Sequence, residues 1–172
     1  MLKIIGALLV IMACSGMGFY EGMELTKHED VMKQIRQMVL LLKGEIRYGN
    51  SSLFDVFDSV AGKIEEMPGE LLRRMAAEMR KADRRAFFEI FEQCVEEEKL
   101  CGRMTEKERS RFLEFGKGLG GFDRETQLAQ MDLYLVELDR SLRELHEEVE
   151  EKKKLYRNLG VLGGFFLALM LW

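Results

Sequence analysis

Both ends of this 172-residue chain are apolar, and the stretch between them is densely charged. No charged side chain lies within Ile4–Tyr20 or within Leu159–Trp172. As a helix the first segment would be about 26 Å long, close to the roughly 30 Å of a hydrocarbon core. The second would be about 21 Å long and approaches that length only if its helix begins near Leu155. The pattern predicts a soluble domain between two membrane attachments.

The composition changes give three parts: an N-terminal membrane helix over residues 1–22, a soluble helical bundle over residues 23–157 and a C-terminal membrane segment over residues 158–172. Basic residues beside membrane helices favour the cytoplasmic side. Only Lys3 lies beyond the first segment, whereas several basic residues precede the second. We therefore expect a cytoplasmic domain with both termini outside. The basic side chains expected at the membrane interface are Lys152, Lys153, Lys154 and Arg157.

A second interpretation of the N-terminus stays open. Lys3, an apolar core and the small residues after it also resemble a secretory signal. Ile11-Met12-Ala13-Cys14 resembles a bacterial lipoprotein cleavage box, and cleavage there would put a lipid on Cys14. The chain would then be a membrane-tethered lipoprotein or helical adaptor with its domain outside the cytoplasm.

Composition argues against several classes of function. The 3 cysteines do not form a paired disulfide framework, and none has a metal-ligand spacing. A formal net charge of −4 does not favour nucleic acid as a partner. His28 and His146 are far apart on expected polar helix faces, and no nucleophile accompanies them. We expect no enzyme activity, no cofactor and no metal.

The central stretch is predicted to be all-α, a bundle of about six helices, because apolar residues recur at helical spacing and only 1 proline is present. The helical patterns are Leu25–Tyr48, Leu53–Ile64, Leu71–Met79, Phe87–Val95, Phe112–Phe115 and a long helix after Asp123. Ends are expected from short signals. These are a cap at Ser51 or Ser52, a hinge at Met67-Pro68-Gly69, a cap at Asp83, an end at Gly102, a capping box at Thr105–Glu108 and a cap at Asp123.

The last helix carries a heptad seam. Its members are Leu128, Met131, Leu135, Leu138, Leu142, Leu145 and Val149. Leu133 and Tyr134 are expected to widen this stripe, which favours bundle core over a dimer zipper, although a homo-oligomer stays open. The pairs Glu148–Lys152 and Glu150–Lys154 are spaced to support the helix.

Gly116-Lys117-Gly118-Leu119-Gly120-Gly121 matches G-x-G-x-x-G, a phosphate-binding pattern. That pattern needs a strand before it, and here an amphipathic helix precedes it. We therefore expect a turn between two helices, with at least one of Gly116, Gly118 and Gly120 at positive φ.

Two segments resemble a known family. They are Glu45-Ile46-Arg47-Tyr48-Gly49 followed by Leu53, and Phe115-Gly116-x-x-Leu119-Gly120-x-x-Asp123-x-x-x-Gln127. Together with the length and the two apolar ends, they are similar to stage III sporulation protein AB. Ser52 stands where a proline would be expected to open a helix.

The resemblance implies a non-enzymatic platform protein of the channel complex between mother cell and forespore, multi-pass in the mother-cell membrane. Such proteins look like the inner-membrane platform of type II secretion and type IV pilus systems. The implied partners are a cytoplasmic secretion-type ATPase and other membrane proteins of the complex. The matched residues, structural at turns or facing a partner, are Glu45, Tyr48, Gly49, Gly116, Gly120, Asp123 and Gln127.

Overall fold

The computed structural model describes residues 26–49, 52–64, 67–81, 85–97, 101–120 and 123–171. The chain divides into two compact units, which are Asp30–Ser141, called here the bundle unit, and Met1–Glu29 with Leu142–Trp172, called the terminal unit. All regular structure in the described residues is helical, which confirms the predicted all-α class. The N-terminal membrane helix expected over residues 1–22 lies outside the described residues.

Six α-helices occur in the described part of the chain, as expected. They are the helix over residues 26–48, α2 (Leu53–Ala61), α3 (Met67–Arg80), α4 (Phe87–Glu97), α5 (Glu106–Leu119) and α6 (Arg124–Leu171). A short 3-10 turn, η1 (Cys101–Arg103), precedes α5.

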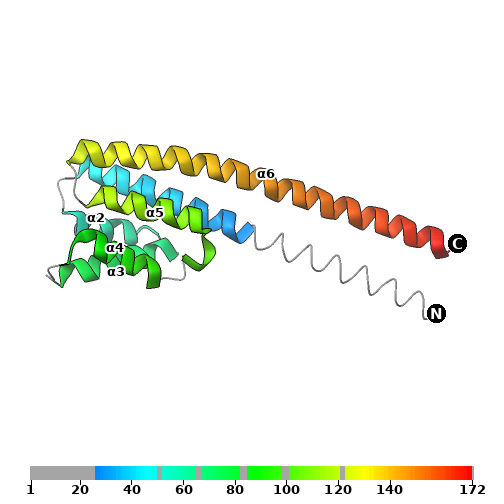
Figure 1. Ribbon diagram of the computed structural model, residues 1–172, viewed down its shortest axis with the longest axis horizontal. Helices are drawn as coiled ribbons and strands as arrows, with labels where there is room; N and C mark the ends of the chain where they lie inside the picture. The colour runs from blue at the N-terminus through cyan, green and yellow to red at the C-terminus, as the bar shows by residue number, and fades with distance from the viewer. Residues whose placement is uncertain are drawn as a thin grey trace. The chain divides into compact units, whose positions relative to one another are not determined.

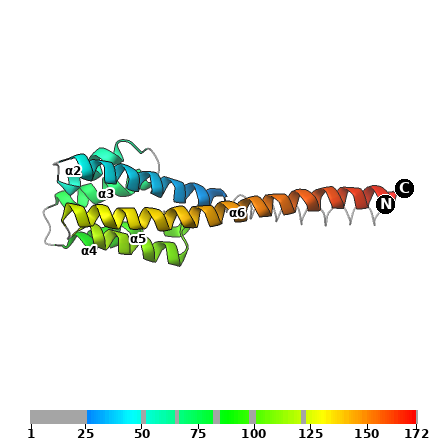
Figure 2. The ribbon, with the colours of Figure 1, turned by 90° about the horizontal axis from the view of Figure 1, so that it is seen from above.

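The bundle unit has two groups of helices (Figure 1 and Figure 2). The helix over residues 26–48, α5 and the first part of α6 run side by side, and α2, α3 and α4 lie against them. Among the shorter helices α2 packs on α3, α3 on α4 and α4 on α5. Ion pairs join Arg36 to Asp139 and Lys43 to Asp132. Residue numbers therefore rise along the first helix as they fall along α6, so these two helices are antiparallel.

The core is built from the apolar faces that the sequence predicts. The largest side chains with almost no exposure come from the helix over residues 26–48 and from α2, α3, α5 and α6: Phe57, Phe112, Met32, Ile35, Met38, Leu42, Leu71, Leu72, Met75, Leu119 and Met131. A row of aromatic contacts crosses this core. Phe57 contacts Phe87, Phe91 contacts Phe112, and Phe112 contacts Tyr134, with ring centroids 6.0, 5.3 and 6.2 Å apart. The row therefore links α2, α4, α5 and α6.

The predicted hinge at Met67-Pro68-Gly69 is wrong, because these residues form the first turn of α3. Proline is tolerated there, since the first N–H groups of a helix have no acceptor within the helix. A Cβ at Gly69 would lie 2.1 Å from the carbonyl oxygen of Ile64. The glycine thus permits a close backbone approach.

Helix α4 starts later than expected. It begins at Phe87, so Ala86 occupies the N-cap position, and the predicted cap at Asp83 is wrong. Asp83 itself lies outside the described residues. The N–H of Ala86 donates to the Glu89 carboxylate at 3.1 Å, which is half of a capping box. The described part of α4 runs to Glu97, residues 98–100 lie outside the described ranges, and Gly102 belongs to η1.

The N-termini of α2 and α5 differ in how the N-cap side chain is hydrogen-bonded. Ser52 occupies the N-cap of α2, but its hydroxyl donates to the Asp55 carboxylate at 2.6 Å and makes no cap bond to the backbone. At α5 the predicted capping box is present, because Thr105 Oγ1 accepts from the Glu108 N–H and the Glu108 side chain accepts from the Thr105 N–H.

The stripe of α6 is narrower than expected. The seam residues are buried or half-buried, and Tyr134 beside the seam is also buried. Leu133 is 58% exposed, so it does not widen the stripe.

The predicted glycine turn after Phe115 is also wrong, since Gly116 and Gly118 lie inside α5. Gly120 is the C-cap with φ −88°, and neither Gly116 nor Gly118 has positive φ. A Cβ added at Gly116 would lie 2.2 Å from an atom of the Phe91 ring. A Cβ added at Gly120 would lie 2.3 Å from an atom of the Phe87 ring. Both glycines therefore allow α5 to approach α4 closely, and close packing explains them without a special backbone conformation.

Candidate functional site

The two signature segments lie at the same end of the bundle unit. Helix 26–48 ends there and α6 begins there. Arg124 Nη2 donates to the carbonyl oxygen of Gly49 at 2.6 Å, which bridges the two segments. We call this region the junction, and it comprises Glu45, Tyr48, Gly49, Asp123, Arg124 and Gln127. The sequence alone gave no reason to include Arg124, because its acceptor is a backbone group 75 residues away.

Two junction residues hold the connection between α5 and α6. Asp123 caps α6 as predicted, with its carboxylate accepting from the Thr126 hydroxyl at 2.6 Å and from the Thr126 N–H at 3.4 Å. These hydrogen bonds, the hydroxyl's first, hold the pKa of Asp123 below its usual value. Gln127 Nε2 donates to the Leu119 carbonyl at 2.6 Å and so satisfies an acceptor at the end of α5. Both side chains therefore stabilise the connection between α5 and α6.

Glu45 ties the first helix to the end of α2. Its carboxylate accepts hydrogen bonds from Lys63 and from Ser59. The hydrogen bond and charge of Lys63 lower the pKa of Glu45. The group is solvated, so this is a surface ion pair of modest energetic value.

Tyr48 differs from the other signature residues because it is 86% exposed. It sits in the last turn of helix 26–48, one residue before Gly49. Exposed aromatic side chains are over-represented among the residues that dominate protein–protein interfaces. Tyr48 is therefore the junction residue whose position suits contact with a partner.

Two basic residues of the terminal unit, Lys152 and Lys153, form ion pairs within α6. Lys152 pairs with Glu148 at 3.0 Å, as predicted. Glu150 pairs with Lys153 at 3.4 Å instead of with Lys154 as expected. The side chain of Arg157 lies outside the described residues. In the same unit, His146 Nδ1 lies 3.0 Å from Oε1 of Glu29. The side chain of Glu29 is buried.

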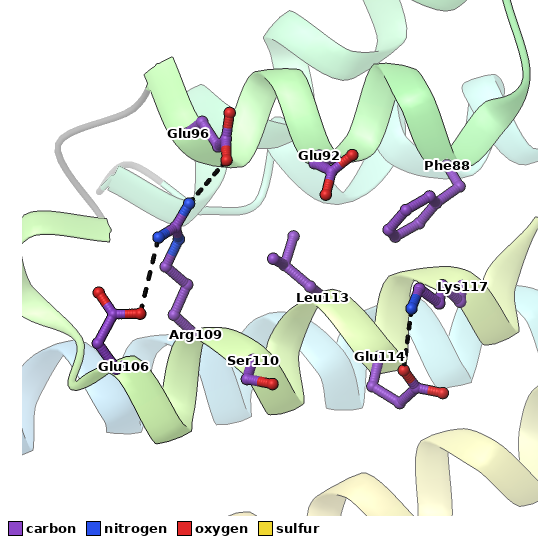
Figure 3. A pocket seen from close by; sticks show the side chains of 9 residues that line it. All are labelled: Phe88, Glu92, Glu96, Glu106, Arg109, Ser110, Leu113, Glu114 and Lys117. Atoms are coloured by element: carbon purple, nitrogen blue, oxygen red, sulfur yellow. Dashed lines mark hydrogen bonds and ion pairs between the residues drawn. The ribbon is translucent and has the colours of Figure 1, made fainter.

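A groove of about 310 Å³ lies between α4 and α5. Figure 3 shows its lining, which is Phe88, Glu92, Glu96, Glu106, Arg109, Ser110, Leu113, Glu114 and Lys117. No motif in the sequence indicates this groove. The acidic residues of α4 were visible as a charged face, but which helix covers that face depends on the packing of α4 against α5.

Charged side chains within this groove are largely paired. Arg109 Nη2 lies 2.7 Å from Glu96, and Nη1 lies 3.8 Å from Glu106. The buried Nε of Arg109 has no acceptor. Lys117 Nζ lies 3.3 Å from Glu114 and 5.2 Å from the centre of the Phe88 ring, a cation–π contact.

Nowhere in the described ranges do three or more His, Cys, Asp or Glu side chains gather so as to hold a metal ion. Over the same ranges no helix combines the length and the apolar character needed to cross a membrane.

Comparisons with known proteins agree with the signature segments. Stage III sporulation protein AB of Bacillus subtilis (strain 168) is 25% identical over 171 residues, which are 99% of each chain. A solved structure of Stage III sporulation protein AB has the same fold, with a TM-score of 0.60 at 21% identity, covering 70% of this chain and 94% of that one. The family model for Stage III sporulation protein AB matches residues 3–172. The chain therefore belongs to the Stage III sporulation protein AB family.

Proposed function

We propose that this protein is a non-enzymatic membrane platform in the channel complex between mother cell and forespore, where its helical bundle docks a cytoplasmic secretion-type ATPase. The observation that carries the proposal is the family match, which extends over residues 3–172 and so includes both apolar ends. The junction supports it, because there Tyr48 presents an exposed aromatic side chain at one end of the bundle unit.

The proposal requires the bundle to face the cytoplasm of the mother cell. A protease added outside intact cells should leave the bundle uncut, and permeabilised cells should lose it. The basic residues on the domain side of the apolar segments are the physical reason. Cleavage without permeabilisation, together with a lipid on Cys14, would instead establish the tethered lipoprotein with an external domain.

Capture of the ATPase tests the partner. The full-length protein, purified from sporulating cells after cross-linking, should retain the ATPase of the same complex. Replacing Tyr48 with Ala should reduce the retained amount several-fold, because a tyrosine that acts as an interface hot spot contributes about 2 kcal/mol or more. Leu133→Ala is the matched control, since Leu133 is also exposed and lies away from the junction. If the wild-type protein retains no ATPase, the proposed function is wrong.

A further inference from the structure

We propose that the groove between α4 and α5 receives a lysine or arginine side chain from a helical segment of a partner protein, with Glu92 as its counter-ion. The inference deepens the proposed function and rests on it, because a docking protein needs a surface that recognises its partner. Three features of the groove carry the argument: its charge balance, the position of Glu92 and the apolar walls beside Glu92 (Figure 3).

The charge balance of the groove is negative. Its lining holds four glutamates against one arginine and one lysine, a formal charge of −2. The two cations are already committed. Arg109 bridges Glu96 and Glu106, and Lys117 pairs with Glu114 and covers the Phe88 ring. An occupant must therefore bring positive charge of its own.

Glu92 is the carboxylate that an incoming cation would meet. It is half-buried on α4, one turn before Glu96, and among the described residues it makes no hydrogen bond or ion pair. Figure 3 shows it in the middle of the groove, between the Arg109 pairs and the Phe88 ring. Partial burial of an unpaired carboxylate is unfavourable, and a cation with hydrogen-bond donors removes that cost.

The walls beside Glu92 suit the stem of a long basic side chain. Leu113 of α5 and the ring of Phe88 of α4 are both half-buried and line the same space. Lysine and arginine bury their methylene groups along apolar surface while the charged end meets a polar group. A volume of about 310 Å³ is at the lower end for ligand pockets, roughly 300–1,000 Å³, which fits a side chain better than a whole helix.

A peptide-binding experiment tests the proposal without the ATPase. The probe is a fluorescent amphipathic helical peptide with arginine on one face and leucine on the other, and the control peptide has citrulline in place of arginine. Fluorescence anisotropy with the full-length protein should show binding of the arginine peptide alone. Glu92→Gln should weaken that binding about tenfold, as expected for one charge-assisted hydrogen bond. Glu147→Gln, at an exposed carboxylate outside the groove, removes the same charge and should have no effect.

A charge exchange makes the test specific. Glu92→Lys should abolish binding of the arginine peptide and restore binding of a peptide with glutamate in place of arginine. Equal weakening by Glu92→Gln and Glu147→Gln would overturn the proposal, because binding would then reflect only the overall negative charge. Equal affinity for free spermidine would overturn it as well, and so would self-association of the protein that Glu92→Gln removes. Capture of the ATPase is read in a separate assay, so failure of either idea is visible by itself.

Discussion

At the scale of single residues, the glycines of the bundle unit differ in whether a neighbouring side chain packs against them. Gly116 and Gly120 allow the rings of Phe91 and Phe87 to lie against the backbone of α5, where a Cβ would overlap them. Gly44, inside the helix over residues 26–48, has open space where a Cβ would stand. Only the first kind is needed for packing, since glycine inside a helix otherwise costs stability.

Substitution with alanine should separate these two kinds. Gly116→Ala places a methyl group in the Phe91 ring, and overpacking of this kind costs about 1–3 kcal/mol. Gly44→Ala is the control and should stabilise the protein by roughly 0.5–1 kcal/mol through helix propensity. Urea unfolding of both variants measures the difference. Equal stability of the two variants would contradict the close approach of α5 to α4.

A second prediction at this scale concerns acid. Hydrogen bonds from Lys81 and then Arg85 lower the pKa of Glu78 from its ordinary value of 4.5 to about 2. Because the pKa is lower in the folded state, the stabilisation is present above pH 4.5 and is lost as the pH falls towards 2. Glu78→Gln should therefore destabilise the protein at about pH 6, where carboxylates are ionised, and have progressively less effect towards low pH.

Chemical unfolding across that pH range measures the effect of Glu78→Gln. Its control is the same substitution in a protein that carries Lys81→Met and Arg85→Met. There the variant and its parent should have the same dependence on pH. A difference that stays constant with pH in the wild-type background would show that Glu78 is not held by these two cations.

At the scale of elements, helices are closed by side chains from other parts of the chain as well as by their own. The Thr105 box closes the start of α5, and Gln127 of the following helix satisfies its last turn. Arg73 of α3 donates to the Ala61 carbonyl at the end of α2, at 3.1 Å. Exchange of such bonds between neighbours makes each helix depend on the next, since isolated short helices are marginal in water.

The box at the start of α5 gives a prediction for this scale. Thr105→Ala removes the acceptor for the Glu108 N–H and should lower the free energy of unfolding by about 1 kcal/mol. Thr105→Ser keeps the hydroxyl and should remain within a few tenths of a kcal/mol of the wild type. Thermal unfolding monitored by circular dichroism compares the two. A serine variant as unstable as the alanine variant would show that the threonine methyl group matters more than the cap.

At the scale of the whole molecule, the bundle unit has its own continuous core. The aromatic row from Phe57 to Tyr134 crosses four helices, and burial raises the pKa of Tyr134 well above its usual value. Ring centroids of Phe115 and Tyr134 lie 4.6 Å apart, which joins α5 to α6. Such a core, formed within Asp30–Ser141, is sufficient reason to expect folding without the apolar ends.

A protein consisting of residues 25–154 should therefore be soluble, and its circular dichroism should be dominated by helix. Helix normally makes up about one third of a globular protein, so a much larger fraction is a demanding expectation. The shortened protein should also unfold in one cooperative transition, since one core holds its helices together. A spectrum with substantial strand, or the absence of a cooperative transition, would contradict the fold.

Much of this fold could be predicted from the sequence, because helical periodicity and local caps involve neighbouring residues. The buried stripe of the helix over residues 26–48, the box at Thr105 and the cap at Asp123 are of this kind. The turn predicted at Gly116 was wrong because a glycine can serve either to allow an unusual backbone conformation or to leave space for a neighbouring ring, and the sequence does not distinguish the two. Only the packing of α4 on α5 distinguishes the two.

The candidate sites divide in the same way. Glu45, Asp123 and Gln127 were identified from the sequence by resemblance, yet their bonding partners and the exposure of Tyr48 became visible only in the fold. The groove at Glu92 had no sequence signal at all. Its walls come from two helices, and the sequence of each helix specifies its own faces but not the neighbour that covers them. Local chemistry therefore determined the helices, whereas the burial of their apolar faces against one another decided which polar groups meet.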